Sequence, residues 1–161
     1  MTKRKVLIAH QTIVDCDAIG NDIMGMATAL IKYNYDVKLL CEYSSENLYE
    51  FLFEHSLLTD FLNNSNSILI YHHSIDWKWG EEILKKFKGK LILKYHNITS
   101  PHFFRPYSEV YYNKCFQGRE DAIYFLSDFV LEKRSCNSKK VKKFDSLEIQ
   151  IEILENNLIY L

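Results

Sequence analysis

Residues 91–104 read LILKYHNITSPHFF, and this stretch indicates the point at which a buried strand leaves a sheet. The apolar run ends at Lys94, and a polar cluster that includes His96 and Asn97 follows it. Pro101 disfavours a helix directly before it, because the residue that precedes a proline is pushed toward extended conformations. In open α/β sheets, ligands bind at the carboxyl ends of the strands. The stretch therefore predicts a candidate site at the edge of such a sheet.

Short apolar runs and helical patterns alternate along the chain on both sides of this stretch. Buried strands are predicted at residues 5–9, 37–41, 67–71 and 90–94. Helices are predicted at residues 22–33, 46–63, 79–87, 110–121 and 128–134, with a further short strand at residues 122–126. Short crossovers between such strands enforce parallel pairing. The predicted fold class is therefore α/β, a Rossmann-like parallel sheet with helices on both faces.

The last part of the chain fits two periodicities. In residues 146–161, SLEIQIEILENNLIYL, apolar and polar residues alternate as in a half-buried strand, yet several apolar residues also fall on one helical stripe. Both alternatives stay open. We expect a Rossmann-like domain over residues 1–143 and a C-terminal extension over residues 144–161.

Composition places the chain among ordinary globular proteins. Its 161 residues suffice for one core, 47% of them are hydrophobic, and the net charge of −1 gives no reason to expect a nucleic-acid partner. The four cysteines are scattered without a C-x-x-C spacing. The first apolar run is too short for a secretory signal or a membrane span. We therefore expect free thiols and a cytoplasmic protein.

Three predicted strand ends carry polar residues. They are His10, Gln11 and Thr12, then His72, His73 and Ser74, and then the cluster from His96 to Thr99. In a parallel sheet these ends converge along one edge, where titratable groups are the usual first hypothesis for a site. A single loop histidine is more often structural than catalytic, so the prediction rests on the set.

Other kinds of site have weaker support. Adjacent histidines on an extended chain point to opposite faces, so His72 and His73 do not easily share one ion, and no H-x-x-x-H spacing is present. We therefore expect no metal site and no cofactor. Residues 17–22 hold one glycine before a helix, for which Asn21 or Asp22 is a candidate N-cap and Asn34 a candidate C-cap. That pattern is only a weak signal for anion binding, and it favours a plain helix-entry turn.

Several motifs taken in order resemble the N-terminal domain of GT-B glycosyltransferases of family 4. They are VLIAHQTIVDCDAIGNDIMGMATALIKYNYDVKLL at residues 6–40, ILIYHHSI at 68–75, LILKYHNITSPHFF at 91–104 and NKCFQGRED at 113–121. The resemblance covers about residues 5–127 and is greatest to bacterial members that build surface polysaccharide or transfer hexoses from sugar nucleotides. The combination is specific, although each motif alone is not.

The resemblance implies roles for individual residues. It puts Ala18, Ile19, Gly20, Asn21 and Asp22 in a loop after the first strand that faces the cleft between two domains. It makes His96 the catalytic candidate, near the transferred sugar. It also implies that His73, Asn97 and Arg119 line the same cleft and bind substrate.

The resemblance also implies partners. Members of the family carry a second Rossmann-like domain that binds most of the nucleotide, and the sequence stops where the linker to it is expected. We therefore expect a chain that holds a glycan or lipid-linked acceptor, is inactive on a nucleotide sugar by itself, and works with a donor-domain subunit or self-associates. A non-catalytic binding or scaffold protein is the alternative. A small flavodoxin-like protein also fits the predicted fold, but the sequence has no phosphate loop that would support it. Residues 103–112 are rich in aromatic side chains, so peripheral contact with the inner membrane face stays an open alternative.

Overall fold

The computed structural model describes residues 3–134, and side chains as far as residue 125. Met1–Arg119 form one compact unit, and a second unit begins at Glu120. The sheet and the candidate site lie in the first unit. The predicted domain boundary at residues 143 and 144, and the strand or helix considered for residues 146–161, lie outside the described residues.

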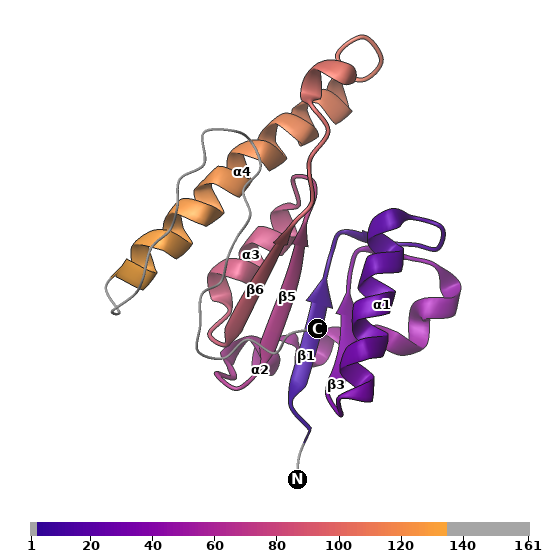
Figure 1. The fold of residues 1–161 in the computed structure, drawn as a ribbon, viewed down its shortest axis with the longest axis vertical. Coiled ribbons are helices and arrows are strands. Elements are labelled where there is room, and N and C mark those ends of the chain that lie inside the picture. Colours follow the sequence, from indigo (N-terminus) through magenta and orange to yellow (C-terminus); the bar gives the residue numbers. More distant parts are fainter. Residues whose placement is uncertain (1–2, 135–161) are drawn as a thin grey trace. The chain divides into compact units, whose positions relative to one another are not determined.

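A parallel four-stranded sheet forms the centre of the first unit (Figure 1). Its strands, in spatial order, are β3 (Asp36–Leu40), β1 (Lys5–Ala9), β5 (Ile68–His73) and β6 (Lys90–Tyr95). Two short strands, β2 (Thr12–Ile13) and β4 (Tyr43–Ser44), pair separately beyond β1 and β3. The chain runs from β1 to β3 on one side and then to β5 on the other, so the strand order reverses between β1 and β5.

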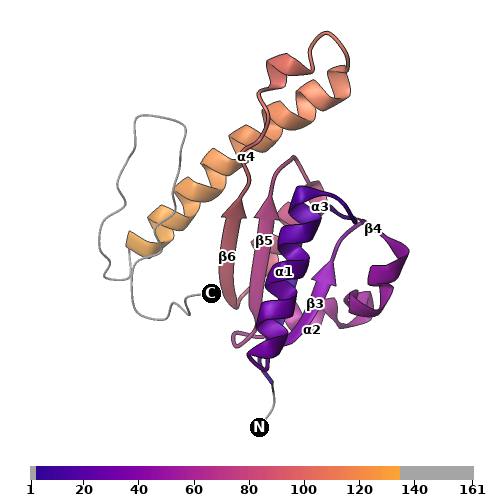
Figure 2. The ribbon, with the colours of Figure 1, turned by 45° about the vertical axis from the view of Figure 1, so that its right-hand side comes forward.

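Helices cover both faces of this sheet, which confirms the predicted fold class. Helix α1 (Ala18–Lys32) buries Ile23 and Ala27 in a core with Ile8 of β1. Helices α2 (Leu58–Asn63) and α3 (Lys78–Lys86) contribute to a second core with the alternate strand residues, such as Leu7. Figure 2 shows α1 in front of the sheet and the other two helices behind it. Side chains that alternate along each strand therefore enter different cores.

Helix α1 begins four residues earlier than predicted, at Ala18 rather than at Asp22. The carboxylate of Asp17 caps it by accepting hydrogen bonds of 3.1 Å from the backbone N–H groups of Ile19 and Gly20. The expectation that residues 18–22 form a loop is therefore wrong. A Cβ on Gly20 would lie 2.1 Å from the Val14 carbonyl oxygen, so this glycine is needed for close packing.

The single helix predicted at residues 46–63 is confirmed only in its last six residues, Leu58–Asn63. The segment instead forms the short 3-10 helices η1 (Glu46–Phe51) and η2 (His55–Leu57), followed by α2. Between the two 3-10 helices Leu52 is extended, and Phe53 donates a 2.7 Å backbone hydrogen bond to Leu39 of β3. The apolar spacing was helical, but this bond to the sheet interrupts the helix.

A single helix, α4 (Glu109–Arg134), replaces three predicted elements. The strand predicted at residues 122–126 is therefore wrong, and the two helices predicted around it are continuous. The β-prone residues there have no proline beside them, and helical neighbours on both sides override so short a run. A further 3-10 helix, η3 (Pro101–Phe103), begins at the proline that was expected to exclude a helix before it. Across the described residues, no helix is both long and apolar enough to cross a bilayer.

Strand β5 extends two residues past its predicted end, so His72 and His73 belong to the strand rather than to a loop. Both pair in register with β6, His72 with Lys94 and His73 with Tyr95. Buried polar residues at a strand end resemble a loop in the sequence, and only the backbone pairing reveals the strand. This extension fixes the direction in which each histidine points.

Candidate functional site

Three of the histidines meet where β1, β5 and β6 end. His10 follows β1, and its Nδ1 donates a hydrogen bond of 3.0 Å to the backbone carbonyl of His72. Nδ1 of His72 lies 2.9 Å from Nε2 of His96, which follows β6. The predicted convergence of the strand ends is confirmed for these three residues. Because a carbonyl only accepts, the hydrogen of a neutral His10 sits on Nδ1, and its Nε2 can accept from the Ser74 hydroxyl 3.3 Å away.

Asp22 completes this cluster from α1. Its two carboxylate oxygens lie 2.5 and 2.7 Å from the ammonium of Lys94, and one of them lies 3.7 Å from Nδ1 of His72. Lys94 is the register partner of His72, so both side chains leave the sheet on the α1 face. Because α1 begins at Ala18, Asp22 is its fifth residue and lies just past the first turn. We call Asp22, His72, Lys94 and His96 the polar cluster.

The imidazoles of the polar cluster are neutral at physiological pH. Burial is the main cause that lowers the pKa of His72 to about 3, and the neighbouring His96 is the second cause. Burial, and then the charge of Lys94, lowers the pKa of His96. Burial also lowers the pKa of His10. A neutral imidazole has one N–H and one nitrogen lone pair, so in the 2.9 Å contact between His72 and His96 one ring donates a hydrogen bond and the other accepts it.

His73 points to the opposite face of the sheet. Its Nε2 donates a 2.7 Å hydrogen bond to the carbonyl of Gly118, and its ring stacks between Tyr71 and Tyr95 at centroid distances of 6.1 Å. A Cβ on Gly118 would lie 2.8 Å from the backbone nitrogen of Asp76, so the glycine permits this approach. The prediction that His72 and His73 point apart is confirmed, and His73 has the contacts of a structural residue.

The remaining residues implied by the family resemblance lie apart from the polar cluster. Asn97 is exposed, and Arg119 is partly buried on α4, where its charge offsets part of the rise that burial causes in the pKa of Cys115. Ala18, Ile19 and Asn21 take part in the first turn of α1, and Gly20 packs on Val14. Of the residues once expected in the cleft loop, Asp22 is the one whose side chain contacts the histidines.

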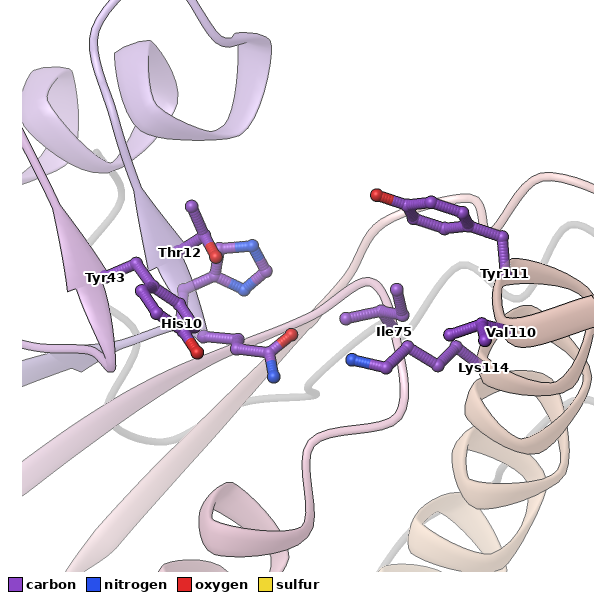
Figure 3. A pocket seen from close by; sticks show the side chains of 8 residues that line it. His10, Thr12, Tyr43, Ile75, Val110, Tyr111 and Lys114 are labelled. Atoms are coloured by element: carbon purple, nitrogen blue, oxygen red, sulfur yellow. The ribbon is translucent and has the colours of Figure 1, made fainter. Parts of the chain in front are cut away.

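A cavity of about 450 Å³ opens beside His10 (Figure 3). It is lined by His10, Gln11, Thr12, Tyr43, Ile75, Val110, Tyr111 and Lys114. The residues after β1, together with Tyr43, form one wall, and the first turns of α4 form the other. The volume is within the range of small-molecule sites. The cavity lies near the point where the strand order reverses, which is the usual ligand position in open α/β sheets.

Fixed polar side chains support this cavity. The carboxylate of Glu42 accepts hydrogen bonds from the Trp77 indole at 2.9 Å and from the Gln11 amide at 3.2 Å. Gln11 is thereby held by an acid that is itself anchored to the packed face of the sheet. Tyr111 and Lys114 reach from α4 toward the opposite wall. The lining thus combines two phenol rings with an amide, a hydroxyl, an imidazole and an ammonium group.

Sequence reasoning identified one side of the cavity and missed the other. His10, Gln11 and Thr12 were recognised as a strand-end cluster. Tyr43 follows the strand at residues 36–40 and could have been found by the same reasoning. Tyr111 and Lys114 lie on a helix, and nothing in their spacing indicates that they face a cavity. None of the residues that the resemblance named for the substrate lines it.

Comparison with protein-family models, with curated proteins and with solved structures found no match for this chain. The cavity and the polar cluster are therefore the features from which a function is inferred.

Proposed function

We propose that this chain is the N-terminal, acceptor-binding half of a glycosyltransferase that moves a hexose from a nucleotide sugar to a glycan or lipid-linked acceptor. The cavity beside His10 is the observation that carries the proposal. A sugar presents C–H groups on its faces and hydroxyls at its rim. The rings of Tyr43 and Tyr111 offer flat apolar surface for the faces, and Gln11 and Thr12 offer hydrogen bonds for the rim.

The chemistry of transfer requires a group that takes a proton from, or polarises, the attacking hydroxyl. His10 lines the cavity, and its Nε2 accepts a hydrogen bond from a hydroxyl, that of Ser74, which is the contact that an acceptor hydroxyl would make. His96 remains the catalytic candidate from the family resemblance. It connects to His10 through His72, whose carbonyl binds His10 and whose ring binds His96.

The cavity also supports the expectation that the chain by itself does not transfer a sugar. Among the residues that line it, Lys114 is the one cation. A departing nucleoside diphosphate is stabilised by several positive groups or dipoles at the oxygens where charge develops. We propose that a donor-binding domain or subunit supplies them. Transfer would take place in the cytoplasm, at the inner membrane face for a lipid-linked acceptor, and the exposed rings of Phe103 and Tyr107 would contact that surface.

The same observation favours a second candidate function, a saccharide-binding protein without transfer activity. One ammonium group suffices to bind an acidic sugar, whereas it does not suffice for transfer. The two candidates share the cavity and differ in whether a donor domain confers turnover.

Binding is tested with the full chain and a panel of neutral and acidic oligosaccharides, measured by calorimetry or NMR. We expect Tyr111→Ala to weaken binding by about tenfold, the loss of one aromatic contact in a site. Tyr107→Ala is the matched control, because Tyr107 is 86% exposed and outside the cavity. Equal binding by the wild type and Tyr111→Ala would remove the cavity from the proposal.

Transfer is tested by adding a donor-binding domain of the same enzyme class, in trans or fused to the C-terminus. We expect no hydrolysis or transfer of a nucleotide sugar by the lone chain, and turnover in the assembly that His10→Ala and His96→Ala each reduce. Robust turnover by the lone chain would contradict the half-enzyme account. Saccharide binding without turnover in any assembly would favour the binding protein.

A further inference from the structure

We propose that Asp22, His72 and His96 form a binding site for a divalent first-row transition metal ion, zinc foremost. The three residues come from α1, from the end of β5 and from the segment directly after β6. Each offers one ligand atom, and these atoms lie within 4.8 Å of one another. The proposal does not rest on the proposed sugar transfer, whose acceptor site is the cavity beside His10, although His96 takes part in both.

The ligand distances fit a single small ion. Two ligands bound to zinc at about 2.0–2.1 Å with a tetrahedral angle lie about 3.3 Å apart. In the structure Nδ1 of His72 and Nε2 of His96 are 2.9 Å apart, and Nδ1 of His72 is 3.7 Å from an oxygen of Asp22. Two of the three spacings are thus within about 0.4 Å of the value for one ion, and the third, between Asp22 and His96, is no more than 4.8 Å. Two imidazoles and one carboxylate also leave a position for water, as open zinc sites do.

The protonation states are those that metal binding needs. A metal ion binds neutral imidazole and ionised carboxylate. Burial keeps the pKa of His72 near 3 and lowers that of His96, so neither ring has to lose a proton at neutral pH. The ring that donates in the 2.9 Å contact between them only has to move its hydrogen to its other nitrogen. The carboxylate of Asp22 lies beside these rings and pairs with the ammonium of Lys94.

The orientation of the buried His72 ring is a second observation. Its ring is 1% exposed, and Nε2 is buried without a hydrogen-bond partner among the described residues. A buried ring nitrogen left unpaired costs stability, which an apolar side chain of similar size would not. Its one polar contact, through Nδ1, points into the cluster. The polar contacts of this buried ring therefore all run through Nδ1, the atom that faces Asp22 and His96.

Lys94 pairs with the carboxylate that the metal ion would bind. Its ammonium contacts both oxygens of Asp22, and its side chain is 38% exposed. A lysine has a flexible four-carbon stem, so the ammonium can move into solvent when a metal ion takes its place. Lys94 and a divalent ion would therefore compete for the carboxylate of Asp22. Removal of the lysine should therefore strengthen metal binding.

The experiment titrates Zn²⁺ into the full chain after chelator treatment, by calorimetry, and Co²⁺ by visible absorption. We expect one Zn²⁺ per chain and a Co²⁺ spectrum without a sulfur-to-cobalt band. Asp22→Asn and His96→Gln should each weaken Zn²⁺ binding by at least about tenfold, since even the loss of an outer partner of a ligand costs that much. Lys94→Met should tighten it by about tenfold, by removing a repelling charge next to the ion. His102→Ala, an exposed histidine outside the cluster, should bind as the wild type does.

Each alternative result overturns the inference. Absence of Zn²⁺ binding in both the wild type and Lys94→Met would do so, as would binding that Asp22→Asn and His96→Gln leave unchanged. A sulfur-to-cobalt band would assign the ion to cysteines, and a loss in His102→Ala would assign it to surface histidines. Far-UV circular dichroism of each variant shows that it is folded. The two ligand variants replace partly buried residues and avoid the fully buried His72.

Discussion

His72 and His73 are neighbours in β5 and are each 1% exposed, yet the two faces of the sheet give them different surroundings. On the α1 face His72 lies among Asp22, Lys94 and His96, which are all titratable. On the other face His73 lies among aromatic rings and bonds to a backbone carbonyl. One step along a strand therefore separates a cluster of titratable groups from a packed aromatic environment. Electrostatics should control stability on the first face and packing on the second.

A change of pH should have the largest effect, and it should act through the α1 face. The pKa of His72 falls from 6.5 in the unfolded chain to about 3 in the fold, so between these values the unfolded chain binds more protons. The contribution of His72 to the free energy of unfolding is fully present above pH 6.5 and is lost as the pH falls toward 3. At 1.36 kcal/mol per pKa unit the loss amounts to up to about 5 kcal/mol. Urea unfolding at a series of pH values, with a chelator present, measures this slope.

His72→Gln isolates this contribution, because glutamine does not titrate. The variant should lose about 1.4 kcal/mol per pH unit less than the wild type between pH 6 and 4. The carboxylates titrate in the same range in both proteins and cancel in the comparison. An identical slope in the two proteins would show that His72 is not the buried neutral base that its surroundings indicate.

On the opposite face, truncation of His73 should have the next largest effect. His73→Ala removes a ring packed between Tyr71 and Tyr95 and leaves the Gly118 carbonyl without that donor. We expect a loss of about 3 kcal/mol in the free energy of unfolding, from the cavity and the broken hydrogen bond together. His96→Ala, on the α1 face, should cost less than half as much, because His96 is only partly buried. A smaller loss in His73→Ala than in His96→Ala would reverse the comparison.

Gly80→Ala tests the packed face without touching a titratable group. Gly80 is buried on α3, and a Cβ there would lie 2.3 Å from the Trp77 ring and 2.6 Å from the Tyr71 hydroxyl. Aromatic rings are rigid, so we expect overpacking to cost about 2 kcal/mol, despite the better helix propensity of alanine. Gly25→Ala is the matched control on α1, where a Cβ would have nothing within 4 Å. It should be neutral or stabilising by chemical denaturation.

The division between the two faces could be predicted from the sequence, whereas the contents of each face could not. Alternation along an extended chain separates His72 from His73 whatever surrounds them. The strand at residues 5–9 was predicted with its observed ends, because KVLIA is an apolar run with polar residues on both sides. The strand through His73 was predicted too short, because two buried histidines look like a loop until their backbone pairs with β6.

Long-range placement explains the other differences. Asp22 enters the polar cluster only because the Asp17 cap starts α1 early, and a cap is one residue whose effect is not visible in hydrophobic periodicity. The segment at residues 46–63 does not form one continuous helix, because Phe53 donates a backbone hydrogen bond to Leu39 of β3, 14 positions earlier in the chain. Tyr111 and Lys114 reached the cavity from a helix whose exposed and buried sides are poorly separated in sequence. Such contacts depend on tertiary structure rather than on local pattern.

The smallest expected change in stability comes from the charge pair at the centre of the α1 face. Lys94→Met removes an ion pair whose side chains are 38% and 37% exposed. Solvent screens such a pair, and the stem of methionine keeps most of the apolar contact, so we expect a loss of no more than about 1 kcal/mol by urea unfolding. The same variant is expected to bind Zn²⁺ more tightly than the wild type. A large loss of stability would mean that Lys94 holds the cluster together as a structural residue, and the idea that it yields its place to a metal ion would lose its basis.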